Sequence, residues 1–193
     1  MSFSQLYDEV QKLEYPVSTR WLREHAIKFS TITAVKEQWS GLINPEIIRG
    51  FYIEGPIGPP IPLAENESLI TLARAMCKGR QGDYWRRFVY TKELMHVFDE
   101  DEEKASDAAK FDLQIERFAD FNAPMSPQYR AETKAFWRAL GVLCPEKSRK
   151  DLCSQLEQGN VSIEVVAASL RLPVEHIHDL MRPDFEAIIS RMK

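Results

Sequence analysis

The sequence predicts an α+β fold: a mostly helical body with a small mixed sheet and a C-terminal helical hairpin. Apolar residues recur with the spacing of amphipathic helices through most of the chain, beginning with residues 3–14. Two segments, 32–35 and 47–53, are instead rich in β-branched and aromatic residues, which is typical of strands. We therefore expect three or four strands near residues 32–63, surrounded by helices.

The other elements follow from periodicity and from residues that start or break helices. Four prolines and two glycines in residues 55–62 predict a turn or an irregular sheet edge, because proline cannot donate a hydrogen bond to a neighbouring strand. The acidic run 99–103 is expected to be a solvated loop. The predicted helices begin at Ser18 or Thr19 and then cover 67–77, 84–99, 108–121, 129–143 and 148–156, a pair across 163–181 that turns near Leu172, and a short closing helix over 185–192.

Composition and charge exclude several classes of protein. Of the 193 residues, 44% are hydrophobic and 28% are charged, which is enough apolar material for a packed core and argues against disorder. The formal net charge of −4 disfavours a nucleic-acid coat or a membrane-surface protein. The three cysteines form no C-x-x-C pair, which argues against a disulfide framework and a thiolate zinc site. No apolar run approaches the roughly 20 residues of a membrane span, and no export signal is visible, so we expect a cytoplasmic protein.

Two segments carry the functional signal. The first reads R-F-V-Y-T-K-E-L-M-H and places Lys92, Glu93 and His96 on one predicted helix. In the second, Glu132 opens the stretch E-T-K-A-F-W-R-A-L-G-V-L-C-P. Taken alone, a glutamate and a histidine three residues apart on a helix are common. The simplest interpretation is then an exposed glutamate beside a partly buried histidine.

The two segments resemble the R-F-x-x-A-H-E-L-G-H and E-x-x-A-x-x-F-A-x-x-L-L-M-P motifs of the ImmA/IrrE-like metallopeptidase family. In the second motif, Arg138 stands in place of the usual phenylalanine and Cys144 in place of methionine. Further similarity extends the resemblance over most of residues 12–181. It implies a zincin-like body over residues 1–146, with residues 147–193 as a C-terminal helical extension packed on this core.

The resemblance also implies the parts of a zinc site, with one part changed. Glu93 takes the position of the general base, His96 that of the second metal ligand and Glu132 that of the third. The first ligand position holds Lys92. At neutral pH a lysine is an ammonium without a lone pair, so it cannot bind zinc. We therefore expect no cofactor, or zinc only if the site is active, and we predict that the Lys92 ammonium replaces the metal ion between the two carboxylates.

A second interpretation keeps a metal. Glu93 and His96 have the Glu-x-x-His spacing of carboxylate-bridged iron sites in helical bundles. Together with Glu132, and with Asp99 or Glu100 one turn further on, they could hold iron or manganese. The complete iron motif requires two such pairs, and the sequence offers one.

The tail contains two more histidines and the spacing of a helix-turn-helix. His176 and His178 are two residues apart, so they do not share a helix face and are expected at the surface or at an interface. Residues 167–181 have helix-turn-helix spacing, but Glu175 and Asp179 would make the second helix a poor phosphate-binding surface. We expect this tail to pack against the core rather than to bind DNA.

Three functions follow from these observations. The first is a catalytically impaired regulatory or partner-binding module, which holds a regulatory protein or peptide in its cleft beside a sheet edge that can add a strand. The second is an active but atypical metallopeptidase that cleaves a regulatory protein such as a repressor. The third is a DNA-binding regulator that uses the tail. The resembled family often serves in prophage or stress-response settings, and the first function needs neither nucleic acid nor a membrane.

Overall fold

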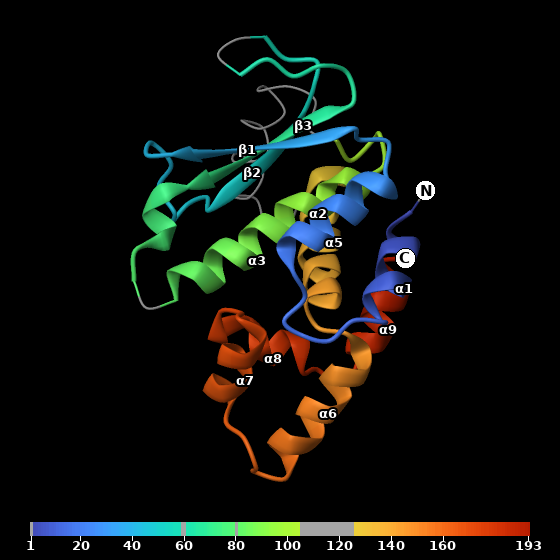
Figure 1. Cartoon of the computed structure of the whole chain (residues 1–193), viewed down its shortest axis with the longest axis vertical. Coiled ribbons are helices and arrows are strands. Elements are labelled where there is room, and N and C mark those ends of the chain that lie inside the picture. Colours follow the sequence, from blue (N-terminus) through green and yellow to red (C-terminus); the bar gives the residue numbers. More distant parts are fainter. Residues whose placement is uncertain (1, 59–60, 80, 105–125) are drawn as a thin grey trace.

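The computed structural model of the chain describes residues 2–58, 61–79, 81–104 and 126–193. The predicted α+β fold is confirmed, because a small mixed sheet lies at one end of the molecule and helices pack beneath one of its faces (Figure 1). The two ends of the chain lie near each other, and the Nζ of Lys193 is 3.7 Å from the Oδ1 of Asp8. None of the helices in the described residues is long and apolar enough to cross a membrane.

The central strand of the sheet is the largest departure from the sequence prediction. The strands are β1 (Ala34–Ser40), β2 (Gly50–Glu54) and β3 (Glu67–Ala73), in the order β1-β3-β2. β1 pairs with β3 in parallel and β2 pairs with it in antiparallel orientation, so the sheet is mixed as expected.

The prediction of a helix over residues 67–77 is wrong, because β3 is followed only by a 3₁₀ turn over Arg74–Cys77. Every residue of β3 after Glu67 is buried. A strand covered on both faces shows a continuous apolar run instead of an alternation, and such a run also fits helical spacing. The region in which we expected the sheet, residues 32–63, therefore does not include the central strand β3.

The remaining predicted helices of the described residues are present. Ser18, Ser126 and Ser162 cap three of them, each accepting a hydrogen bond from a backbone N–H in the first turn. The helix expected over 108–121 lies outside the described residues. The helices are α1 (Phe3–Val10), α2 (Thr19–Lys28), α3 (Gly82–Leu94), α5 (Pro127–Leu143), α6 (Glu146–Glu157), α7 (Ile163–Leu170), α8 (Ile177–Leu180) and α9 (Phe185–Ser190), with 3₁₀ turns over Met95–Phe98 and Val174–His176.

One hydrophobic core connects the sheet, α3, α5 and the tail. Within the tail, the guanidinium of Arg149 donates to both carboxylate oxygens of Glu146 at 2.7 and 2.8 Å. The same side chain donates to the backbone carbonyls of Leu180 and Arg182, both at 3.4 Å. These bonds join α6 to the end of α8. The tail contacts the rest of the chain through the common core and through Arg138 of α5, whose Nε donates to the carbonyl of Met192 at 3.1 Å. A division of the chain at residue 146 stays a prediction.

Candidate functional site

The two motif segments meet where α3 ends and α5 passes beside it. Gly50 of β2 lets the sheet approach α3 closely, since a Cβ at this position would lie 2.8 Å from the Cγ1 of Val89. The Nζ of Lys92 is 2.9 Å from the Oε1 of Glu93 on α3 and also contacts the Oε2 of Glu132 on α5. The expected contact between this ammonium and the two carboxylates is therefore present.

His96 lies in the 3₁₀ turn after α3 and turns its two nitrogens toward opposite partners. Its Nε2 is 3.4 Å from the Oε1 of Glu132 and 3.7 Å from the Oε2 of Glu93. Neither contact is an aligned hydrogen bond, so these groups interact through charge. The Nδ1 is 2.6 Å from the Oδ2 of Asp99, and the ring of Tyr52 stacks on the imidazole at 5.8 Å between centroids.

The acidic run 99–103 is not simply solvated, which corrects the sequence prediction. The side chains of Asp99 and Glu103 are only 4% and 3% exposed. Asp99 lies 3.6 Å from an Nη1 of Arg138, and Glu103 accepts a hydrogen bond from Lys134 at 2.8 Å. Both cations are on α5, four residues apart, and they offset the burial of the two carboxylates. Like charges four residues apart on a helix repel each other, so Lys134 and Arg138 gain from these acidic partners, but the sequence does not show which acidic residues supply them.

The side chains proposed for an iron or manganese site do not converge. Asp99 binds the far nitrogen of His96, on the side of the ring away from Glu132. Glu100 is 76% exposed and faces Lys134 at 3.8 Å. Neither lies beside Glu93, so the side chains of this interpretation do not meet at one point in the structure, and an iron or manganese site stays a prediction.

The charges at the site balance. Burial alone would lower the pKa of His96, but the carboxylates of Asp99 and Glu132 raise it to about 10. Burial also opposes the charge of Lys92, yet its two carboxylate partners hold the pKa of its ammonium above the ordinary value. Burial would raise the pKa of Glu132, but the adjacent cations hold it well below its usual range. Three cations thus face three carboxylates in what we call the Lys92 cluster: Lys92, His96 and Arg138 against Glu93, Asp99 and Glu132.

This arrangement does not fit a catalytic zinc ion. The Lys92 ammonium has no lone pair, so the first ligand position supplies no ligand, and this cation contacts Glu132. Of the ligand positions implied by the resemblance, His96 and Glu132 remain, whereas catalytic zinc sites use three protein ligands. Within the described part of the chain, no three His, Cys, Asp or Glu side chains are grouped in a way that could hold a metal ion.

A cavity of about 570 Å³ opens beside the Lys92 cluster. One end is formed by Lys92, Glu93 and Glu132, and the first residues of β2 form part of its wall. Because β2 is an edge strand of the described sheet, a sheet edge flanks the cavity, as predicted. Aromatic side chains line the other end: Trp85, Phe88, Phe136 and His176.

His176 was expected at the surface or at an interface, and it lies half-buried where the tail meets α3 and α5. Its ring centroid lies 4.2 Å from that of Phe88 and 5.2 Å from those of Trp85 and Phe136. Burial lowers the pKa of this imidazole. His178 is exposed, as expected. Sequence spacing does not reveal the difference, because the rings around His176 come from two distant helices.

The tail does not present a recognition helix. The predicted second helix is a 3₁₀ turn followed by the four residues of α8, and its apolar residues Ile177 and Leu180 are fully buried. It therefore packs against the core, as expected, and contributes no projecting helix for a DNA groove.

Comparison of the chain with protein-family models, with curated proteins and with solved structures finds no match. Membership of the ImmA/IrrE-like family therefore stays a prediction from the two motifs. The geometry brings these motifs together, since Lys92 of the first contacts Glu132 of the second.

Stability is expected to fall on the alkaline side because His96 loses its proton. The pKa of His96 is raised from 6.5 to about 10, so the stabilisation by the imidazolium is complete below about pH 6.5 and is lost as the pH rises toward 10. A pKa difference of one corresponds to about 1.4 kcal/mol, so the free energy of unfolding should fall by more than about 1.4 kcal/mol over this window. The contribution of Glu132, whose pKa is lowered from 4.5, is present above that pH and is lost on acidification.

Urea denaturation across this pH range tests the expectation. The variant His96→Gln is the control, and its disadvantage relative to the wild type should shrink steadily as the pH rises. Two parallel pH profiles would mean that His96 is neutral in the folded chain.

Proposed function

We propose that this chain is a catalytically impaired, metal-independent relative of the ImmA/IrrE-like metallopeptidases, which binds a segment of a regulatory protein in the cavity beside the Lys92 cluster. The observation that carries the proposal is the position of the Lys92 ammonium between Glu93 and Glu132. Two carboxylates facing each other in a partly desolvated pocket repel unless a cation lies between them. Lys92 supplies this cation with a fixed covalent stem, so the architecture persists without a metal.

The state of Glu93 supports impaired catalysis. A general base in a zinc peptidase takes a proton from a metal-activated water. Here the Oε1 of Glu93 is 2.9 Å from the Lys92 ammonium and its Oε2 is 3.7 Å from the Nε2 of His96. Both oxygens thus face cations, and the side chain is only 2% exposed.

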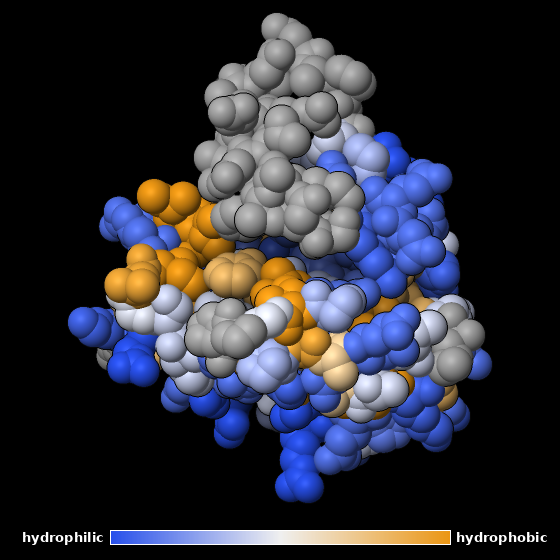
Figure 2. Space-filling view, turned by 90° about the horizontal axis from the view of Figure 1, so that it is seen from above, coloured by the Kyte–Doolittle hydropathy of each residue, from blue (hydrophilic) through white to orange (hydrophobic). Residues whose placement is uncertain are grey.

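The cavity supports a binding role. Its volume of about 570 Å³ lies within the range of ligand sites, roughly 300–1,000 Å³. Aromatic rings at one end and charges at the other suit a peptide with an apolar anchor and a polar group. In the connection between β1 and β2, Leu42 is 98% exposed and Ile47 is 76% exposed, and Ile47 also lines the cavity. Figure 2 looks down on this end and shows apolar surface gathered at one side. The partner we propose is a cytoplasmic regulatory protein, in the prophage or stress-response setting that the resemblance implies.

Peptide selection in the presence of a chelator tests this function. A displayed random peptide library is selected against the full chain with EDTA, and the Kd of the selected peptides is measured by fluorescence anisotropy. We expect binding to persist without metal and to weaken about tenfold or more in Phe136→Ala, because an aromatic anchor in a pocket contributes on the order of 1–2 kcal/mol. Val165→Ala removes an exposed side chain outside the cavity and should leave the Kd unchanged. Binding that requires added zinc would contradict the proposal.

A further inference from the structure

A second cavity, of about 460 Å³, lies between α2, α3 and the end of α7, away from the Lys92 cluster. Two carboxylates, Glu37 and Asp83, line it together with five guanidinium groups. The formal excess is three positive charges, in a chain whose net charge is −4. The guanidinium groups belong to Arg20, Arg23, Arg86, Arg87 and Arg171.

Arg87 is the unusual member of this group. Its Nε and Nη2 are buried and have no hydrogen-bond partner among the described residues. Burial lowers the pKa of this guanidinium to about 10, and the positive charge of Arg171 acts in the same direction. A buried donor without an acceptor costs free energy, and a second cation nearby adds to that cost. The arrangement therefore lacks an acceptor that carries negative charge.

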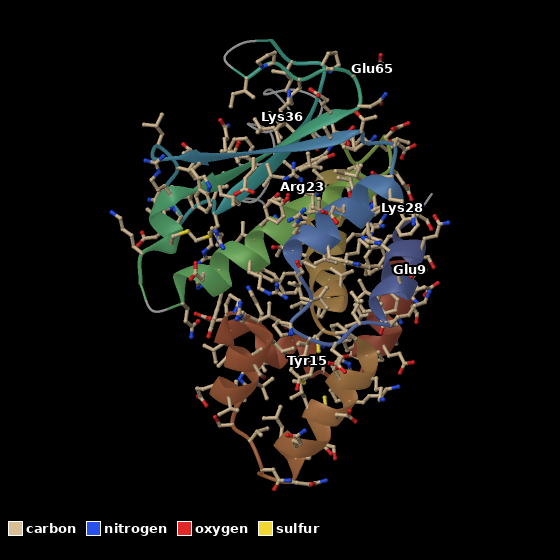
Figure 3. All side chains as sticks on the ribbon, viewed as in Figure 1. Glu9, Tyr15, Arg23, Lys28, Lys36 and Glu65 are labelled. Atoms are coloured by element: carbon tan, nitrogen blue, oxygen red, sulfur yellow. The ribbon has the colours of Figure 1, made fainter. Side chains whose placement is uncertain are left out.

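The surrounding groups do not supply that acceptor. Glu37 and Asp83 are both exposed, and Asp83 forms an ion pair with Arg86 at 3.9 Å. Arg23 is held in place by donating to the backbone carbonyl of Val35, and Figure 3 shows its side chain in the space between α2 and the sheet. The cavity is therefore lined both by Arg23, which a hydrogen bond holds in place, and by Arg87, whose buried donors have no acceptor among the described residues.

We propose that this cavity binds a phosphate group, either as inorganic phosphate or as part of a small organic phosphate. The planar guanidinium can donate two parallel hydrogen bonds to one phosphate group. Several guanidinium groups around one cavity favour an anion that carries two negative charges. The volume exceeds that of a single ion, and the rings of Tyr84 and Tyr90 line the remaining space. The inference shares no residue with the Lys92 cluster and does not depend on the function proposed for it.

The test is a titration of the full chain with inorganic phosphate and, separately, with adenosine monophosphate. Binding is followed by calorimetry and by thermal unfolding, with sodium chloride holding the ionic strength constant. We expect saturable binding and a rise in the unfolding temperature. Tighter binding of the nucleotide would assign the site to an organic phosphate, and equal binding would assign it to the phosphate ion. No saturable binding of either probe would overturn the proposal.

Variants separate this site from general charge effects. Arg87→Met should weaken binding about tenfold or more, while the variant without phosphate stays at least as stable as the wild type, because an unpartnered buried charge is removed. Arg171→Gly removes the second cation at a position whose φ of 53° suits glycine, so it should fold and also bind weakly. Arg74→Met changes an exposed arginine outside the cavity and should bind as the wild type does. Undiminished binding by both pocket variants would refute the site.

Discussion

Replacing Lys92 by methionine is expected to lower the free energy of unfolding by about 3 kcal/mol. Removing one partner of a buried ion pair typically costs roughly 3–5 kcal/mol, because the other charge stays buried without compensation. We expect a cost at the lower end of this range. The side chain of Glu132 is 38% exposed, so water can solvate its unpaired carboxylate, whereas that of Glu93 is 2% exposed and stays buried without a cation. Urea denaturation at neutral pH measures the loss.

The chain offers a matched control for this prediction. Lys36 contacts Glu67 at 2.8 Å, a distance close to that between Lys92 and Glu93, but its side chain is 40% exposed. A partly exposed pair of this kind contributes at most about 1 kcal/mol. Lys36 also donates to the carbonyl of Pro62 at 2.8 Å, so Lys36→Met should lower the free energy of unfolding slightly, and by less than Lys92→Met does. Adding Glu93→Gln to Lys92→Met should restore part of the lost stability by removing the stranded charge. Equal losses in Lys92→Met and Lys36→Met would mean that the contact at the site is no stronger than a surface pair.

The sequence predicted the centre of the site better than its surroundings. Lys92, Glu93 and Glu132 could be placed together because the resemblance pairs the two motifs. The spacing along the first motif is a local property of one helix, whereas the position of Glu132 beside it came from the resemblance alone. The pairing of Asp99 with Arg138 was missed because it depends on how the turn after α3 folds back onto α5. That turn winds as a 3₁₀ helix instead of continuing α3, and no periodicity in residues 95–98 indicates the change.

The errors in the fold have a similar origin. β3 was mistaken for a helix because burial on both faces removed the polar alternation that identifies a strand. The helix ends, by contrast, were predictable where a serine caps the first turn, as at Ser18, because the capping bond involves neighbours in sequence. The same distinction explains why the arginine cavity was not foreseen. Arg23, Arg87 and Arg171 are far apart in the chain, and only the packing of three helices brings them around one space.

Under the proposed relationship to the zinc peptidases, the balance of charges around Lys92 explains how the site persists without a metal. An intact zinc site has a divalent ion among its carboxylate and imidazole ligands, and here a lysine and a protonated histidine supply two positive charges instead. Asp99 still holds the Nδ1 of His96, as a carboxylate does behind a metal-bound histidine. The contact between Asp99 and His96 is therefore of the kind that orients a metal-bound histidine, and Lys92 stands at the first ligand position of the proposed relationship.

Replacing Lys92 by histidine is accordingly expected to create zinc binding, with about one zinc ion per chain. The substitution removes the ammonium that covers Glu132 and adds an imidazole four residues before His96, on the same side of the helix. With that cation gone and a metal supplied, His96 can release its proton and bind through Nε2, because Asp99 fixes the ring from the other side. Elemental analysis of the purified variant, followed by a zinc titration against a competing chelator, measures the gain.

Two companion variants make the result specific to this site. Adding Glu132→Gln to Lys92→His removes the third ligand and should abolish stoichiometric zinc binding, while Lys36→His places the same new side chain on the sheet surface and should bind none. Because Lys92 cannot act as a ligand and Glu132 is held by it in the wild type, a wild-type chain that carries one zinc ion would contradict the replacement of metal by ammonium. A Lys92→His chain that folds but stays free of zinc would instead show that His96, wound into the 3₁₀ turn after Leu94, no longer shares a face with position 92.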